Sequence, residues 1–159
     1  MALPPTEELK SALEQLLPGV SLTVEGDAIV VTPKDLIAVC RSLKETERFG
    51  LDYLSNLTAV DYPKEQRIDL VYHLYSMAQK HGPVALVVHV DRTKAKIDSA
   101  TSIWRGAEFQ EREVYDLFGI TFEGHPDLRR ILMWEGFEGH PMRKDYVVED
   151  QDAPIEETK

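Results

Sequence analysis

Residues 67–92, RIDLVYHLYSMAQKHGPVALVVHVDR, decide the fold class of this chain. In the first part of this stretch an apolar residue occurs at every second position from Ile68 to Leu74, which is the pattern of a strand with one buried face. The second part, at 83–90, is apolar almost throughout and is typical of a central strand. A third strand-like run, LSNLTAVDYP, precedes them at 54–63. The three runs predict an antiparallel or mixed sheet.

Helical patterns lie on both sides of these strands. Residues 6–17 carry leucines on one helical face and two acids in the first turn. Residues 32–48 begin with Thr-Pro-Lys-Asp, which provides an N-cap and a proline at the first helical position, and continue with an apolar stripe. Residues 104–119 show helical spacing again and end at a glycine. With a hairpin expected over 21–32, the pattern predicts an α+β fold with helices packed on one face of the sheet.

Composition and charge exclude several classes of function. The chain of 159 residues has 18 Lys and Arg against 28 Asp and Glu, a formal net charge of -10, so a nucleic-acid partner is not expected. Its only cysteine, Cys40, excludes an intrachain disulfide and every multi-cysteine metal or iron-sulfur site, and agrees with a reducing cytoplasm. No apolar run approaches the roughly 20 residues of a spanning helix, so we expect membrane contact only through a partner.

The C-terminal third contains the pentapeptide FEGHP twice, at 122–126 and at 137–141. Each copy is followed within a few residues by a pair of basic side chains, and no helical or strand period persists through this part of the chain. Arginine interleaved with leucine, tryptophan and phenylalanine is the composition of an interface core. We therefore divide the chain into an α+β domain over 1–121, an irregular partner-binding strap over 122–146, and an acidic flexible tail over 147–159.

Two other kinds of function remain open at this point. Glu111, Glu113, His125 and His140 could form the site of a freestanding acid-base or metal enzyme, although each histidine lies between glycine and proline in a loop and no metal-binding spacing is present. A binding module for a small ligand is the third possibility, and it would show a closed pocket. Ion pairing is the interpretation we favour for the carboxylates.

A long stretch of this region resembles a known family. The segments EREVYDLFGITFEGHPDLRRIL at 111–132 and GFEGHPMRKDY at 136–146 are similar to the most characteristic part of one subunit family of proton-translocating NADH:quinone oxidoreductase, which is respiratory complex I. This is the family of the small α+β subunit of the peripheral arm. The remainder of the chain is compatible with the α+β domain of that family.

The resemblance implies a non-catalytic subunit without a cofactor of its own. Such a subunit would lie beside the quinone-site chain that resembles the hydrogenase large subunit and beside a cluster-bearing chain. FMN and iron-sulfur clusters would then belong to partner subunits, and this subunit, as part of the complex, would lie peripherally on the cytoplasmic face of the inner membrane. Related membrane-bound hydrogenases and deazaflavin-dependent dehydrogenases use similar subunits and are the alternative.

The residues expected at the partner interface come from the matching segments and the strap. They are Glu111, Arg112, Glu113, Asp116, His125, Asp127, Arg129, Arg130, Trp134, Phe137, His140, Arg143, Lys144 and Asp145.

Overall fold

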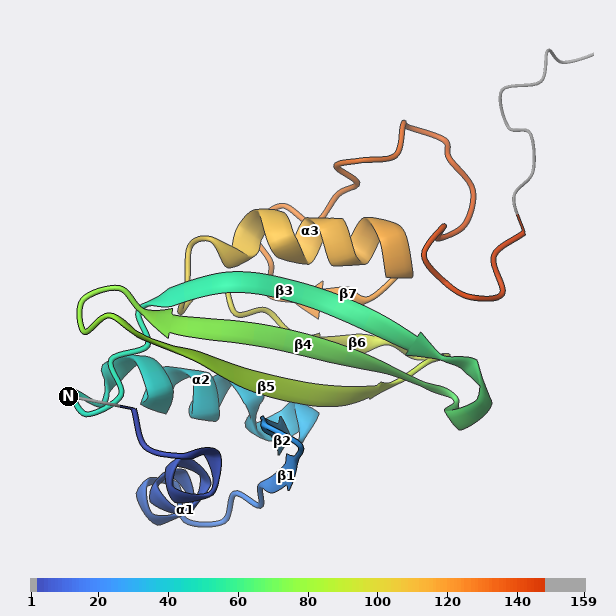
Figure 1. Ribbon diagram of the computed structural model, residues 1–159. Coiled ribbons are helices and arrows are strands. Elements are labelled where there is room, and N and C mark those ends of the chain that lie inside the picture. Colours follow the sequence, from blue (N-terminus) through green and yellow to red (C-terminus); the bar gives the residue numbers. More distant parts are fainter. Residues whose placement is uncertain (1–2, 148–159) are drawn as a thin grey trace, which may run out of the picture.

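The computed structural model describes residues 3–147, which form an α+β fold built on a five-stranded sheet (Figure 1). Apart from Val147, the predicted acidic tail lies outside the described residues. No helix between residues 3 and 147 is both long and apolar enough to cross a bilayer. The elements in chain order are α1 (Thr6–Leu16), β1 (Thr23–Glu25), β2 (Ala28–Val31), the 3-10 turn η1 (Pro33–Asp35), α2 (Leu36–Glu45), β3 (Tyr53–Tyr62), the 3-10 turn η2 (Pro63–Glu65), β4 (Arg67–Ser76), β5 (His81–Asp91), β6 (Lys96–Asp98), α3 (Ala107–Phe118) and β7 (Thr121–Glu123).

The sheet is mixed, as the sequence predicted, with strand order β1-β2-β5-β4-β3. β4 pairs antiparallel with both β3 and β5, and in this register Leu70 lies opposite Ala59 on one side and Val88 on the other. β2 is antiparallel to β1 but parallel to β5, because the chain crosses to the far edge of the sheet before it returns through β3 and β4. The nearly continuous apolar run of β5 follows from its central position.

The helices cover one face of the sheet, and the main core lies between the two layers. Every second residue of β4 from Ile68 to Leu74 is buried, as the alternation predicted. The Tyr72 ring of β4 lies near Cys40 of α2 and Glu111 of α3, which places both helices on the same side. Figure 1 shows the strands β3 to β5 with α3 next to β3 and α2 beyond β5. The prediction that helices pack on one face is confirmed.

Two local predictions need correction. α2 ends at Glu45 instead of near Arg48, because the chain turns at Thr46 and inserts Phe49, which is 1% exposed, into the core. A second sheet of two short parallel strands, β6 and β7, was not predicted, since three residues are too few to show a period. The strap as we defined it therefore begins inside β7, where Phe122 belongs to the core.

Candidate functional site

Asp116, in the last turn of α3, is the main anchor of the strap. Its fully buried Oδ2 accepts hydrogen bonds from the backbone amides of Ile131, Leu132 and Met133 at 3.0, 2.7 and 2.9 Å. Its Oδ1 accepts a hydrogen bond from Nη1 of Arg130 at 2.9 Å. Burial by itself would raise the pKa of Asp116, but these donors outweigh burial and hold the pKa below its usual value. The carboxylate is therefore charged and saturated within the chain.

Arg112, one turn earlier on α3, holds the adjoining part of the strap. Its Nε donates to the carbonyl of Arg129 at 3.1 Å and its Nη2 to the carbonyl of Arg130 at 3.2 Å. Its guanidinium lies over the ring of Phe109, 5.9 Å from the ring centre. Arg112 is buried, so both Arg112 and Asp116, which we expected at a partner interface, instead serve contacts within this chain.

The two FEGHP copies fasten the strap to opposite ends of α3. In the first copy, His125 Nε2 donates to the carbonyl of Glu108 at 2.9 Å and its Nδ1 accepts the amide of Asp127 at 3.0 Å. In the second copy, His140 Nδ1 donates to the carbonyl of Asp116 at 2.9 Å. The repeated motif thus brackets the helix near its first and last turns, and this explains why the sequence contains it twice.

In each basic pair, one side chain bonds to α3 and the other is exposed to solvent. Arg130 contacts Asp116 and also donates to the carbonyl of Gly139 at 2.9 Å, and Arg143 donates to the carbonyl of Phe118 at 2.7 Å. Arg129, by contrast, has a 69% exposed side chain that pairs with Asp127 at 2.8 Å. Arg129 and Lys144 are exposed, whereas Arg130 and Arg143 are half-buried. That both pairs face a partner stays a prediction.

The end of the strap, at Lys144 and Asp145, is held by Asp61 and Arg92, which were not predicted as site residues. Asp61 at the end of β3 forms a bidentate pair with Arg92, at 2.7 and 3.0 Å, and Arg92 Nη2 also contacts Asp145 at 2.6 Å. The Lys144 amide donates to Asp61 Oδ2 at 2.9 Å, and its ammonium lies 5.6 Å from the ring centre of Tyr62. Arg92 holds the pKa of Asp61 below its usual value. Asp61 lies near the end of β3 and Arg92 directly follows β5, and both positions lie at the same end of the sheet, so this pair could have been suspected.

Besides its exposed charged residues, the strap exposes large apolar side chains. Ile131, Leu132 and Trp134 are 37%, 55% and 49% exposed, and Met142 is exposed as well. Trp134 packs edge-on against Phe137, with the ring centres 4.7 Å apart. Large apolar side chains gathered on one irregular segment are typical of a protein interface, and we call residues 131–134 the docking loop.

Glu111 lies inside the core and away from the strap surface. It is 0% exposed and accepts hydrogen bonds from the Ser99 hydroxyl at 2.6 Å and the Ala100 amide at 2.7 Å. His125 Nε2 lies 4.0 Å from its Oε2. Burial raises the pKa of Glu111 to about 7, although the two hydrogen bonds oppose that change. Glu111 is therefore not available to a partner.

The geometry gives little support to an acid-base or metal site. Glu113 is exposed on α3 whereas Glu111 is buried, so the two carboxylates do not share a cleft. His125 and His140 bond to backbone carbonyls near opposite ends of the helix. Among the described residues, no group of three or more His, Cys, Asp or Glu side chains is placed to hold a metal ion.

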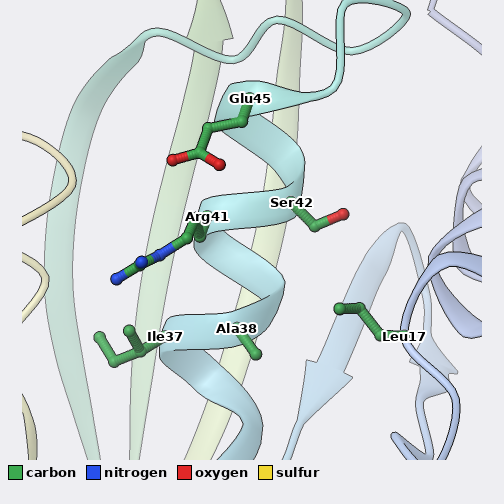
Figure 2. A pocket seen from close by; sticks show the side chains of 6 residues that line it. All are labelled: Leu17, Ile37, Ala38, Arg41, Ser42 and Glu45. Carbon is green, nitrogen blue, oxygen red and sulfur yellow. The ribbon is translucent and has the colours of Figure 1, made fainter.

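A groove of about 470 Å³ runs along α2, on the other side of the molecule from the strap (Figures 1 and 2). Figure 2 shows Ile37 and Arg41 on one side of α2 and Leu17 facing the helix from the end of α1. Ser42 and Glu45 complete its polar lining. The groove has neither the enclosure nor the converging polar groups of a small-ligand site.

Comparison with known proteins agrees with the family resemblance found in the segments at 111–132 and 136–146. The family model described as "Respiratory-chain NADH dehydrogenase, 30 Kd subunit" matches residues 29–152. The chain belongs to this family. It is 41% identical over 141 residues to the corresponding NADH-quinone oxidoreductase subunit of Moorella thermoacetica, a match that covers 87% of this chain and 93% of the relative. The corresponding subunit of Roseiflexus sp. (strain RS-1) is 42% identical over 141 residues, with coverage of 87% and 80%.

Solved structures show the same fold in related proteins. A chain of the membrane-bound sulfane sulfur reductase, an archaeal respiratory membrane complex, superposes with a TM-score of 0.69 at 28% identity, over 89% of this chain and 85% of that chain. The trypsin-resistant fragment (1-134) of Nqo5 gives a TM-score of 0.58 at 27% identity, over 79% of this chain and 100% of that chain. The family's α+β fold is thus confirmed for this chain.

Proposed function

We propose that this chain is a non-catalytic scaffold subunit in the peripheral arm of a proton-translocating NADH:quinone oxidoreductase. The observation that carries the proposal is the strap, whose backbone at residues 129–133 is bonded to α3 while Ile131, Leu132 and Trp134 remain exposed. A strap fixed in this way can hold neighbouring subunits at a set distance from one another. Two relatives that are named as a subunit of NADH-quinone oxidoreductase are 41% and 42% identical to the chain, which supports the assignment.

In this proposal the redox chemistry belongs to other subunits. FMN and the iron-sulfur clusters are carried by partners. An iron-sulfur cluster is held by several cysteine thiolates, and the only thiol of this chain, Cys40, is buried in the core. The partners are the quinone-site chain that resembles the hydrogenase large subunit and a neighbouring cluster-bearing chain. The subunit lies on the cytoplasmic face of the inner membrane and meets the membrane only through the complex. Its contribution to turnover is positional.

A second candidate is the equivalent subunit of a related membrane-bound respiratory complex. The similarity to a chain of the sulfane sulfur reductase, at a TM-score of 0.69, favours this alternative. The two candidates share the scaffold role and differ in the electron donor and acceptor of the complex.

The test is purification of the native complex through a tag on this chain. We expect co-purifying subunits that carry flavin and iron, together with NADH-dependent quinone reduction by the eluate. The same partners with a different electron donor would favour the second candidate. Recovery of the chain alone would contradict both proposals.

A matched pair of variants tests the strap within that experiment. Leu132 and Leu16 have similar exposed fractions, 55% and 51%, but Leu132 lies on the docking loop and Leu16 on α1. We expect Leu132→Ser to reduce recovery of the complex and Leu16→Ser to leave it unchanged. Trp134→Ala should weaken association by roughly 30-fold or more if Trp134 is an interface hot spot, which corresponds to about 2 kcal/mol. Equal recovery of all variants would show that the strap is not the interface.

A further inference from the structure

We infer that Asp116 is a positioning residue that holds the docking loop in its binding shape before any partner arrives, and that the loop fits an apolar groove with a basic rim on a protein partner. This inference rests on the proposed function. It goes further because it assigns the shape of the interface to one carboxylate inside this chain, and because it specifies the chemistry of the surface that receives the loop.

The first argument is the geometry at Asp116. Three successive amides, those of Ile131, Leu132 and Met133, point at one oxygen of its carboxylate within 3.0 Å. Successive N–H groups converge on one anion only where the backbone curls around it. With the amides turned inward, the Leu132 side chain is left more than half exposed. The bonds that bury the backbone thus also present the apolar side chains.

The second argument is that the adjoining peptide groups are fixed by α3 as well. Arg112 donates hydrogen bonds to the carbonyls of residues 129 and 130, and Asp116 accepts hydrogen bonds from the amides of residues 131–133. Consecutive peptide groups from 129 to 133 are therefore each bonded to a charged side chain of α3. Hydrogen bonds to charged groups are about twice as strong as neutral ones. The docking loop needs no partner to acquire its shape.

The third argument is the position of Asp116 in its helix. An acid in the last turn is unfavourable beside the negative end of the helix dipole, and α3 has no basic residue in that turn. Because Asp116 is also buried, its charge needs donors from outside the helix. The donors come from the strap, and they lower the pKa of Asp116 despite its burial. The charged carboxylate therefore favours the conformation in which the strap is bonded to α3 over one in which the strap is detached and hydrated.

Charge indicates what the docking loop binds. Beside Trp134, the exposed Glu135 forms no ion pair among the described residues, whereas the exposed Arg129 is paired with Asp127 at 2.8 Å. The chain as a whole carries a formal charge of -10. An anionic membrane surface or a second copy of this acidic chain would repel the loop. The surface that complements both features is an apolar groove with a basic rim on another protein.

Hydrogen exchange on the full chain without partners, read by mass spectrometry, tests the positioning role. We expect the amides of residues 131–133 to be protected in the natural protein, and to exchange about tenfold faster or more in Asp116→Asn. The amides of β4 and β5 should be unchanged in that variant. Asp127→Asn is the matched control, because Asp127 is exposed on the same strap, pairs with the Arg129 side chain and should leave residues 131–133 protected.

Recovery of the complex from cells that carry each variant completes the test. We expect Asp116→Asn to weaken association, with Trp134→Ala weakening association while exchange at residues 131–133 stays slow. If Asp116→Asn does not fold, Arg112→Lys, which keeps the charge but is too short for both carbonyls, takes its place. Unprotected amides in the natural protein, or full association of Asp116→Asn, would overturn the positioning role.

The remaining outcomes separate this inference from the proposed function. If Trp134→Ala weakens association and Asp116→Asn does not, only the positioning role fails. If neither variant weakens association, the strap is not the interface and this inference fails, whereas the proposed function fails only if the natural chain is recovered without flavin- and iron-bearing subunits. Binding of the natural chain to phosphatidylserine vesicles, or a dimer that Leu132→Ser dissociates, would overturn the proposed kind of partner.

Discussion

Replacing Glu111 by Gln should reduce the dependence of folding stability on pH. Burial raises the pKa of Glu111 from its usual 4.5 to about 7 in the folded chain. As the pH rises above 4.5 the unfolded chain therefore loses a proton that the folded chain retains, so the free energy of unfolding falls. The fall is complete once the pH passes about 7, where the carboxylate is charged in both states. The change in pKa corresponds to ~3 kcal/mol in total, at 1.36 kcal/mol per pH unit.

Titration of other groups in the chain does not obscure this fall in stability between about pH 5 and about pH 8. Cys40 on α2 and Tyr72 on β4 have pKa values raised by burial, so both stay neutral in this range. Asp61 and Asp116 have pKa values below the usual 3.8, and their stabilising contribution is lost only at lower pH. His125 follows β7 and lies 4.0 Å from the Glu111 carboxylate, so it could contribute to the pH dependence of stability. Measuring His125→Gln alone and combined with Glu111→Gln separates the contribution of His125 from that of Glu111.

Urea unfolding followed by tryptophan fluorescence at about pH 5 and about pH 8 measures the difference. We expect the stability of Glu111→Gln relative to the natural protein to be greater at the higher pH by ~2 to 3 kcal/mol. Glu113→Gln, which removes an exposed carboxylate from the same helix, should show no such difference. Parallel pH profiles for Glu111→Gln and the natural protein would refute the assignment of a buried, proton-binding Glu111.

Two further predictions concern the contacts that shape the strap. Gly119 has a φ of +73°, and a Cβ placed there would lie 2.5 Å from the His140 ring, whereas Gly26 has a φ of +60° and open space around it. Gly26→Ala should lower the free energy of unfolding by ~1 to 2 kcal/mol from backbone strain alone. Gly119→Ala should lower it by at least ~1 kcal/mol more, because the added Cβ also meets the His140 ring. Equal losses for the two variants would contradict the packing of His140 on α3. Arg92→Ala should lower the free energy of unfolding by ~3 to 5 kcal/mol because it leaves Asp61 buried without its partner. Adding Asp61→Asn to Arg92→Ala should recover part of that loss. If the effects of the two substitutions simply add, Asp61 and Arg92 do not interact as described.

The β4–β5 part of the fold was predictable because burial on a strand follows a local rule. Side chains alternate between the two faces, so the residues from Ile68 to Leu74 show by their spacing which face is buried. The parallel pairing of β2 with β5 has no such pattern, because it depends on where the chain crosses the sheet. β6 and β7 are too short for a period to be visible.

The candidate site divides in the same way. The sequence by itself determined the family, through the motifs around 111–132, and it located the strap through its composition. Only the tertiary structure decided that Asp116 and Arg130 face each other within the chain while Trp134 faces outward. The physical reason is that a charged side chain is stabilised by whichever donor or acceptor lies within about 3 Å, and residues distant in sequence meet at that distance only after the sheet and helices have packed.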